Sequence, residues 1–203
     1  MRLALGISDT TGVVYGIRLL EVLRGAPDVE THLVISRAAR RAIAHETDYD
    51  LEGVDALATR TYDDRDLGAT LASGSFRTAG MVIAPCGIET VAALANSDAA
   101  SLITRAGDVT LQEGRPLVVV VRETPLHLGH LRQLLALAEM GGVILPPMPA
   151  FYPRPRTVDD IVNHTVGRVL DRFHIAHTLV REWTGTGRPQ RPPEELERDR
   201  APS

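Results

Sequence analysis

The residues that follow the apolar run Pro116–Val121 are of types that bind anions and transfer protons. A continuous apolar run of this kind is typical of a strand that is buried on both faces. An arginine and a carboxylate at its end, here Arg122 and Glu123, suit anion binding and proton transfer. His127 and His130 could bind a metal ion from one helix face, but no third ligand stands at a matching spacing. Helix capping and surface hydrogen bonding are therefore the favoured roles for this histidine pair.

Two earlier turns have a similar strand–turn–helix context. Gly6–Gly12 is rich in glycine and hydroxyl groups and opens a helix, whose first N–H groups could bind an anion. A helix that is simply capped would need no ligand, and the residues alone leave both interpretations open. The second turn, Pro85–Thr90, contains Cys86, which could act as a nucleophile. A lone cysteine without a paired base is more often a small buried hydrophobic residue.

An extended loop carries two of the few aromatic side chains. Phe151 and Tyr152 lie within the proline-rich stretch Pro146–Pro155. They could line an apolar pocket or close the hydrophobic core.

Apolar periodicity predicts how these turns are positioned. It indicates strands at residues 3–7, 32–35, 81–84, 116–121 and 143–145, and helices at about 13–24, 38–45, 88–94, 102–111, 126–140 and 158–173. Ser36 is placed to cap the second helix, and residues 47–79 form a loop-rich excursion with short helical or strand pieces. The alternation predicts a doubly wound, mainly parallel α/β sheet with helices on both faces, Rossmann-like or flavodoxin-like. Ligands of such sheets bind at the carboxyl ends of the strands, so the polar turns should converge there.

Composition narrows the function classes. The chain has 203 residues, 22 basic against 26 acidic, and every basic residue is an arginine. The absence of lysine excludes pyridoxal phosphate Schiff bases, lysine aldolases and the P-loop lysine, although a genome rich in G and C explains the bias most simply. The net charge of −4 argues against nucleic-acid binding, and no apolar run is long enough for a membrane span. Cys86 is the single cysteine, so an intrachain disulfide is excluded.

We expect one cytoplasmic domain over 1–183 and a disordered tail over 184–203.

Taken together, these stretches resemble the UbiX-type flavin prenyltransferases, within the wider set of flavodoxin-like flavin-binding proteins. The resemblance runs from Met1 to about Trp183. Its most specific part is Arg122–Leu131 combined with Pro146–Pro155. The other stretches that carry it are Gly6–Tyr15, Ser36–Arg40, Glu46–Asp48 and Pro85–Thr90.

The resemblance implies an activity that the residues alone do not name. Such enzymes join a dimethylallyl group from dimethylallyl phosphate to reduced FMN, with new bonds at flavin N5 and C6. The product, prenylated FMN, serves partner decarboxylases of the UbiD type. The resemblance also implies that no metal is needed and that the chain forms a homo-oligomer, a dodecamer, with sites at subunit interfaces. Whether the donor is a monophosphate or a diphosphate stays open.

Matching the motifs position by position implies roles for individual residues. Glu123 would relay the proton and Glu46 would assist. FMN would contact Asp9, Thr10, Thr11, Ser36, Gly87, Ile88, Glu89, Thr90 and Arg122. The prenyl phosphate would meet Tyr152 and Arg168, with Arg105 and Gln112 as further contacts and Trp183 lining the prenyl site.

Several of these positions depart from the family pattern. The first turn reads Asp9-Thr10-Thr11 where the family usually has Gly-Ala-Ser. Gly87 and Glu89 stand where the family has Ser and Lys, and Gln112 replaces a phosphate-binding Lys. Glutamine still donates a hydrogen bond but without charge assistance, so these changes predict weaker binding of the prenyl phosphate.

Other functions fit the same fold. A homologue that binds FMN without catalysis could act as a carrier or as a subunit of a decarboxylase system. A flavin-dependent cysteine decarboxylase is disfavoured because the second turn reads Gly-Ile-Glu-Thr and the stretch at Pro147-Met148-Pro149 lacks an asparagine. A dinucleotide dehydrogenase is disfavoured further because the first turn is not a GxGxxG turn.

Overall fold

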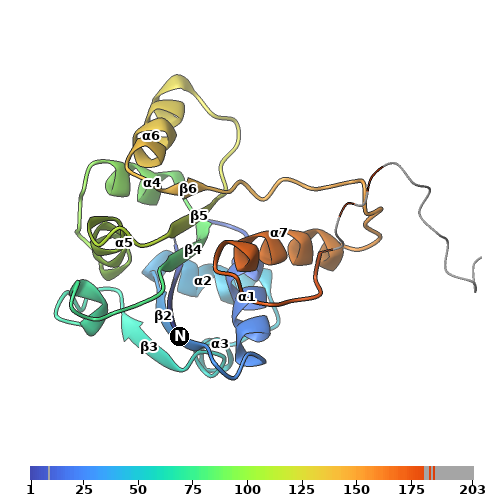
Figure 1. Cartoon of the computed structure of the whole chain (residues 1–203), viewed down its shortest axis with the longest axis horizontal. Helices are drawn as coiled ribbons and strands as arrows, with labels where there is room; N and C mark the ends of the chain where they lie inside the picture. Colours follow the sequence, from blue (N-terminus) through green and yellow to red (C-terminus); the bar gives the residue numbers. More distant parts are fainter. Residues whose placement is uncertain (9, 181–182, 184, 186–203) are drawn as a thin grey trace, which may run out of the picture.

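One parallel sheet organises the residues that the structure describes, which are 1–8, 10–180, 183 and 185. This computed structural model arranges the strands in the order β3-β2-β1-β4-β5-β6 (Figure 1). The strands are β1 (Arg2–Ile7), β2 (Glu30–Ile35), β3 (Arg60–Asp63), β4 (Met81–Cys86), β5 (Leu117–Val121) and β6 (Val143–Ile144). The predicted doubly wound α/β fold is confirmed, and the strand order is that of a Rossmann-like sheet. The predicted tail, 184–203, lies outside the described residues apart from Gly185.

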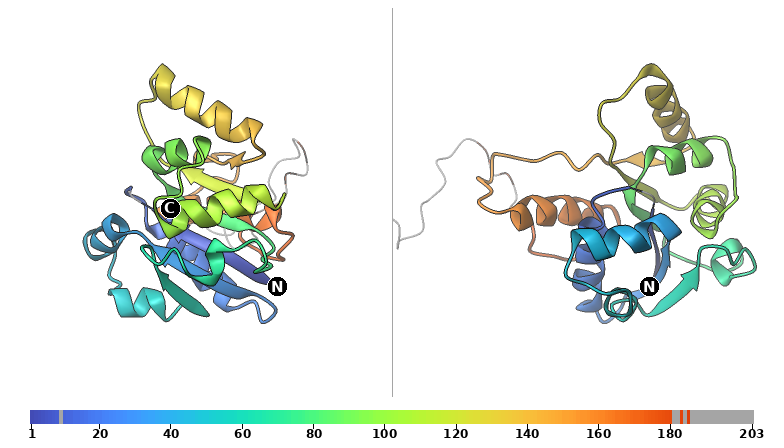
Figure 2. Two further views of the ribbon diagram at one scale, coloured as in Figure 1. Left: turned by 90° about the vertical axis from the view of Figure 1, so that its left-hand side faces the viewer. Right: turned by 180° about the vertical axis from the view of Figure 1, so that it is seen from behind.

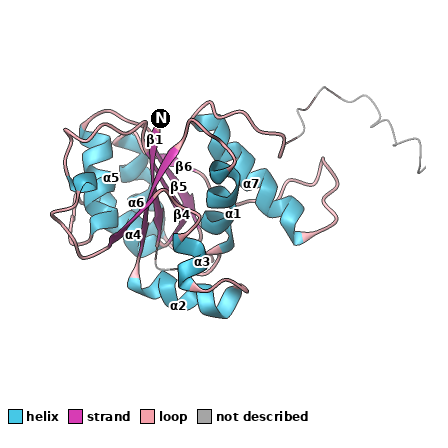
Figure 3. Cartoon of the chain, turned by 90° about the horizontal axis from the view of Figure 1, so that it is seen from below, coloured by secondary structure: helices cyan, strands magenta, loops and turns pink. Residues whose placement is uncertain are grey.

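Helices cover both faces of this sheet. One face is covered by α1 (Val14–Arg24), α2 (Arg37–Glu46), α3 (Leu51–Asp55) and α7 (Val158–Arg172). The other is covered by the 3₁₀ turn η1 (Thr70–Ala72), α4 (Ile88–Ala95), α5 (Leu102–Gln112) and α6 (Leu128–Glu139). Figure 3 shows α5 on one side of the strands with α1 and α7 on the other, and Figure 2 shows the same layers from two further sides. No helix in the described part of the chain is long and apolar enough to span a membrane.

The apolar side chains of the central strands β1, β2, β4 and β5 alternate between the two faces. In β1, Leu3, Leu5 and Ile7 pack with α1 and α7, whereas Ala4 packs with the α5 side. All of β5 is buried, as its continuous apolar sequence predicted. Burial on both faces is what a parallel sheet with helices on each side requires.

The chain reverses its direction of winding beside β1. β1 pairs with β2 along one edge, while β4, which comes later in the sequence, pairs with the other edge. The crevice at such a reversal lies at the carboxyl ends of the strands and is the usual ligand site in open α/β sheets. A ligand site is therefore expected at the ends of β1 and β4.

Glycines allow α1 to begin at this edge and to lie close to the sheet. Gly12 has a φ of +96°, which a residue with a side chain rarely adopts. A Cβ added at Gly16 would lie 2.3 Å from the backbone oxygen of Ala84 and 2.8 Å from the Ile7 side chain. Only glycine, which has no Cβ, therefore allows α1 to pack this closely over β1 and β4.

Gly16→Ala should destabilise the protein by about 1–3 kcal/mol or more, because α1 has to move away from β4 to admit the methyl group. Urea unfolding followed by circular dichroism measures this change. Gly25→Ala is the matched control, since Gly25 has an ordinary helical φ and its nearest atom is 3.3 Å from an added Cβ. Equal stability of the two variants would contradict the packing argument.

The excursion at residues 47–79 contains short elements, as expected. It holds α3, the edge strand β3 and η1. β3 pairs in parallel with β2, but only Tyr62 in it is half-buried, so its sequence has no alternating apolar pattern. An edge strand of this kind is defined by its partner and gives little sequence signal.

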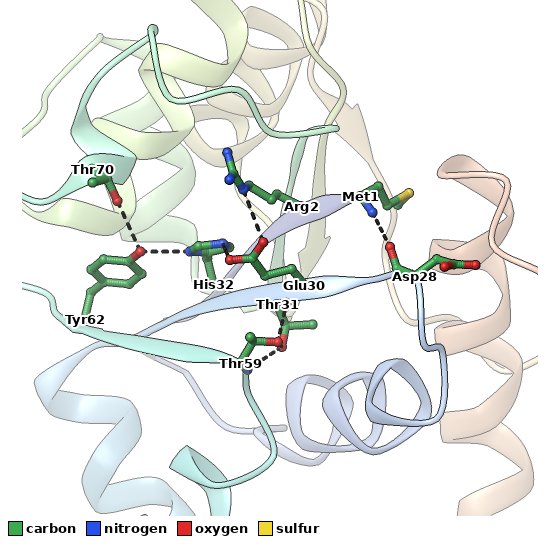
Figure 4. Close-up of polar contacts among 9 residues, drawn as sticks. All are labelled: Met1, Arg2, Asp28, Glu30, Thr31, His32, Thr59, Tyr62 and Thr70. Carbon is green, nitrogen blue, oxygen red and sulfur yellow. Dashed lines mark hydrogen bonds and ion pairs between the residues drawn. The ribbon is translucent and has the colours of Figure 1, made fainter.

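A polar cluster joins β1, β2 and β3 on the face of the sheet that η1 covers (Figure 4). The Nδ1 atom of the buried His32 lies 2.8 Å from the Tyr62 hydroxyl, which in turn lies 3.1 Å from Oγ1 of Thr70. His32 Nε2 is 3.2 Å from a carboxylate oxygen of Glu30 but outside hydrogen-bonding geometry. Arg2 donates to the other oxygen of Glu30 at 3.2 Å.

Acidification should weaken the fold through this cluster. Burial lowers the pKa of His32 below its ordinary value, and the nearby Glu30 carboxylate only partly opposes this. The unfolded chain therefore binds a proton more readily, so stability is lost as the pH falls through about 6.5. We expect the free energy of unfolding to decrease less steeply from about pH 7 to about pH 5 in His32→Asn than in the wild type. His45→Asn, at an exposed helical position, should keep the wild-type slope; a His32→Asn slope that also equals the wild type would exclude this role.

Candidate functional site

Ser8 joins the turns that follow β1 and β4. Its hydroxyl donates to the carbonyl oxygen of Pro85 at 3.2 Å and accepts from the amide of Gly87 at 3.1 Å. Its backbone amide also donates to Pro85, at 3.2 Å. Ser8 is 1% exposed, so these contacts are shielded from water.

The end of β5 belongs to the same cluster. The amide of Arg122 donates to the carbonyl of Cys86 at 3.0 Å, and the Thr10 hydroxyl donates to the carbonyl of Arg122 at 3.4 Å. The amide of Ser36 donates to the carbonyl of Ile7 at 3.0 Å, which adds the end of β2. The predicted convergence of the strand-end turns is confirmed by these contacts.

Glu46 occupies the start of α1. One of its carboxylate oxygens accepts from the amide of Gly12 at 2.7 Å and from the amide of Val13 at 3.3 Å. A carboxylate is favoured here by the positive end of the helix dipole. The capped-helix interpretation of the first turn therefore holds for these two amides. Glu46 comes from the last turn of α2, so the contact ties α2 to α1 at the site.

Ser36 caps α2 and the second turn opens α4, as their sequence context predicts. The buried Ser36 hydroxyl accepts from the amide of Ala39 at 3.1 Å and caps α2. Gly87 begins α4 without a side-chain cap, and Glu89 is exposed in the first turn of this helix. Cys86 is fully buried, as expected of a small hydrophobic residue.

The residues after β5 follow directly on this junction of turns. Arg122 and Glu123 are half-buried, and the Glu123 carboxylate accepts from the amide of Thr124 at 2.9 Å. His127 Nδ1 accepts from the amides of Gly129 and His130 and caps α6. Capping was the favoured role, and the described residues contain no cluster of metal-binding side chains.

An aromatic group lies beside α7. The rings of Tyr152 and Trp183 meet edge-to-face at 5.4 Å between centroids, and those of Tyr152 and His164 at 6.0 Å. Tyr152 is thus the central member of an aromatic cluster. Phe151 is 73% exposed and does not close the hydrophobic core. The long loop that carries both aromatics runs from β6 to α7 (Figure 1).

A hollow of about 300 Å³ opens between α7 and the residues after β6. It has an apolar wall and a basic wall. Its lining residues are Val143, Leu145, Pro146, Met148, His164, Thr165, Arg168 and Arg172. Burial, aided by the charge of Arg168, lowers the pKa of His164, so this ring is neutral at neutral pH and the arginines supply the positive charge.

Arg105 and Gln112 do not reach this hollow within one chain. Both lie on α5, across the sheet from Arg168 on α7. Arg105 instead donates to the carbonyl of Ala72 at 3.3 Å and pairs with Asp108. Gln112 is exposed at the end of α5, shortly before β5 begins. It is therefore near the amino ends of the strands, away from the turns at their carboxyl ends.

Asp9, a predicted flavin contact, lies outside the described residues.

Three side chains in or just after α7 were not predicted from the sequence: His164, Asp171 and His177. His164 joins Tyr152, and Asp171 contacts both Arg168 and His177. The spacing of His164, Arg168 and Asp171 places them on one helix face, and that periodicity was the available signal. Nothing local in the sequence indicates the contact of His177.

Known proteins identify the family of this chain. The family model described as Flavoprotein matches residues 1–170. Flavin prenyltransferase UbiX of Escherichia coli strain K12 is 55% identical over 186 residues, which are 91% of this chain and 98% of that protein. The chain belongs to the family of UbiX-type flavin prenyltransferases.

Solved structures of UbiX-type proteins are similar over the same region. A dodecameric FMN-dependent UbiX-like decarboxylase from Escherichia coli O157:H7 is 49% identical, with a TM-score of 0.89 over 91% of this chain and 100% of that one. AnUbiX in complex with FMN and dimethylallyl pyrophosphate is 41% identical, also with a TM-score of 0.89, over 92% and 98%. The fold described above is therefore that of the UbiX-type proteins.

Removal of the Glu46 carboxylate should weaken the contact between the end of α2 and the start of α1 in this UbiX-type protein. Glu46→Ala leaves two amides without their acceptor and should lower the free energy of unfolding by about 0.5–2 kcal/mol. Glu46→Gln keeps a side-chain oxygen and should lose less. Urea titration measures both, with the exposed Glu139→Ala as control; a loss no larger than that of the control would show that the contact contributes nothing.

Proposed function

We propose that this UbiX-type protein transfers a dimethylallyl group from dimethylallyl phosphate to reduced FMN, with bonds to flavin N5 and C6. The observation that carries this proposal is the hydrogen-bonded junction of the turns after β1, β4 and β5, with Arg122 and Glu123 directly after β5. The high identity to flavin prenyltransferases over nearly the whole chain supports it.

The donors in the crevice suit a flavin. The first turn of α4 has no side-chain cap because Gly87 lacks a side chain, so its amides can donate to ligand oxygens. Thr10, Thr11 and Arg122 supply hydroxyl groups and a cation from the neighbouring turns. The exposed Glu89 is the one anionic member of this predicted set that the structure describes, and its carboxylate would have to point away from the flavin phosphate.

The hollow beside α7 suits a small allylic phosphate. Arg168 and Arg172 can neutralise the phosphate, while Val143, Leu145 and Met148 cover a short hydrocarbon chain. The ring of Tyr152 meets that of His164, which lines the same hollow, and the ring of Trp183 meets Tyr152. This combination of arginines and apolar side chains matches a donor with one charged end and one apolar end.

The residues have separate tasks in this reaction. The carbon–oxygen bond of the donor breaks, the phosphate leaves with the bonding electrons, and arginine cations stabilise the charge that develops on it. The aromatic faces stabilise the positive charge on the allyl group. N5 of reduced FMN would bond to the allyl cation and lose its proton to the freed phosphate. That phosphate would return the proton to the remaining carbon–carbon double bond, so that C6 can bond to the resulting tertiary cation. Glu123 then accepts the proton that C6 releases, or passes it to the freed phosphate, and Glu46 holds the first turn in position.

We further propose that this protein forms a dodecamer and delivers prenylated FMN to a decarboxylase of the UbiD type. The similar UbiX-like decarboxylase is dodecameric. This chain exposes Leu128, Leu131 and Leu135 along one side of α6, and Met148 and Phe151 on the loop before α7. Apolar surface of this kind marks interfaces. Arg105 and Gln112 would then approach the donor site of a neighbouring copy.

Anaerobic incubation with reduced FMN and dimethylallyl phosphate tests the activity. We expect a flavin heavier by one five-carbon unit in the mass spectrum, formed about 100-fold or more slowly by Glu123→Gln, which cannot accept the proton. Glu139→Gln, on the exposed end of α6, should match the wild type.

The same incubation with dimethylallyl diphosphate identifies the donor. A protein that holds FMN and forms no product with either donor would refute the proposal and favour the non-catalytic carrier, which Gly87, Glu89 and Gln112 make the second candidate.

A further inference from the structure

The chain folds back along α7 after this helix ends. We call this part of the chain the strap; its described residues are Phe173–Val180 and Trp183. Gly167 allows the close approach, because a Cβ there would lie 2.4 Å from the Val180 side chain and 2.9 Å from the His177 ring. The segment after α7 can be followed beside the helix in Figure 1. The strap is therefore packed against α7 and does not simply leave it.

One hydrogen bond of His177 fixes its tautomer. The backbone amide of Leu179 donates to Nδ1 of His177 at 3.2 Å, so Nδ1 carries no proton. The proton of the neutral ring is then on Nε2, which donates to Oδ1 of Asp171 at 3.0 Å. The His177 side chain is 8% exposed, so this contact has little competition from water.

The same carboxylate also holds Arg168. Oδ2 of Asp171 lies 2.7 Å from Nη1 of Arg168, one turn earlier on α7. Asp171 thus joins the arginine of the donor hollow to the strap. These side chains and the strap line a second hollow of about 390 Å³, on the strap side of Arg168.

Trp183 stands at the far end of the strap. It meets Tyr152 edge-to-face, and Tyr152 meets His164 in the same way. Because few residues separate Val180 from Trp183, the place at which the strap is fastened limits where the indole can lie.

We propose that Asp171 and His177 form a latch that holds Trp183 against Tyr152, and that both are positioning residues for the prenyl donor. This proposal rests on the function proposed above for the hollow beside α7. Neither residue touches the donor: Asp171 acts through Arg168 and His177, and His177 acts through the strap. The Asp171 carboxylate thereby positions both the arginine and, through the strap, the tryptophan of the donor site.

Trp183 is the single tryptophan of the chain, so its fluorescence reports on the strap in the protein without any substrate. We expect His177→Ala to lower the steady-state anisotropy of the indole and to increase its quenching by acrylamide. His177→Gln keeps an N–H that can donate to Asp171 and should restore much of the wild-type signal. Thr178→Ala, at the exposed neighbouring position, is the matched control and should leave the signal unchanged.

Activity then tests the positioning role. In His177→Ala the KM for dimethylallyl phosphate should rise about 3- to 10-fold, the size of one aromatic contact. The dissociation constant of FMN should not change. Wild-type anisotropy in His177→Ala would overturn the latch, and lowered anisotropy with an unchanged donor KM would overturn its role in donor binding. If the wild type forms no prenylated FMN, the proposed function fails, and the anisotropy still decides whether the latch exists.

Discussion

The buried hydroxyl of Ser8 donates to the carbonyl of Pro85 and accepts from the amide of Gly87. These contacts span the point at which the chain changes its direction of winding, between β1 and β4. Without this hydroxyl the buried amide of Gly87 would lose its acceptor, at a cost of about 1–3 kcal/mol, whereas the carbonyl of Pro85 would still accept from the backbone amide of Ser8. The position of α4, and with it the amides offered to a flavin, depends on this junction.

Carboxylates organise the polar parts of the molecule around this junction. Glu46 holds the start of α1, and Asp171 joins Arg168 to His177. In each case the acid fixes a group that belongs to a proposed ligand site, and it does so through contacts within the chain. A chain whose permanent cations are all arginines suits this arrangement, because a guanidinium can bind a carboxylate on one side and still present N–H groups on another.

The proposed donor site requires groups from both sides of the sheet. Arg168 lies on α7 and Trp183 contacts Tyr152 beside this helix, whereas Arg105 and Gln112 lie on α5 across the sheet. A sheet buried on both faces separates these groups by its own thickness and by the side chains that cover it. Only a second copy of the chain can bring such groups together, which agrees with the apolar side chains left exposed on α6 and on the loop before α7.

Local patterns in the sequence predict every strand except β3, every longer helix and the turns that carry polar side chains. The apolar periods of β1, β5 and α1 are local properties of the chain, and Ser36 was recognisable as a cap because its partner is three residues away. β3 escaped this reasoning because an exposed edge strand shows no alternation.

Tertiary structure decided which of the polar residues meet. The contact of Glu46 with Gly12 spans 34 residues, and that of Thr10 with Arg122 spans 112, so neither leaves a pattern in a short window. The same holds for Arg105, whose helix was predicted but whose side of the sheet was not. Local spacing fixes the face of a helix on which a side chain lies, but only the winding of the whole chain fixes what that face meets.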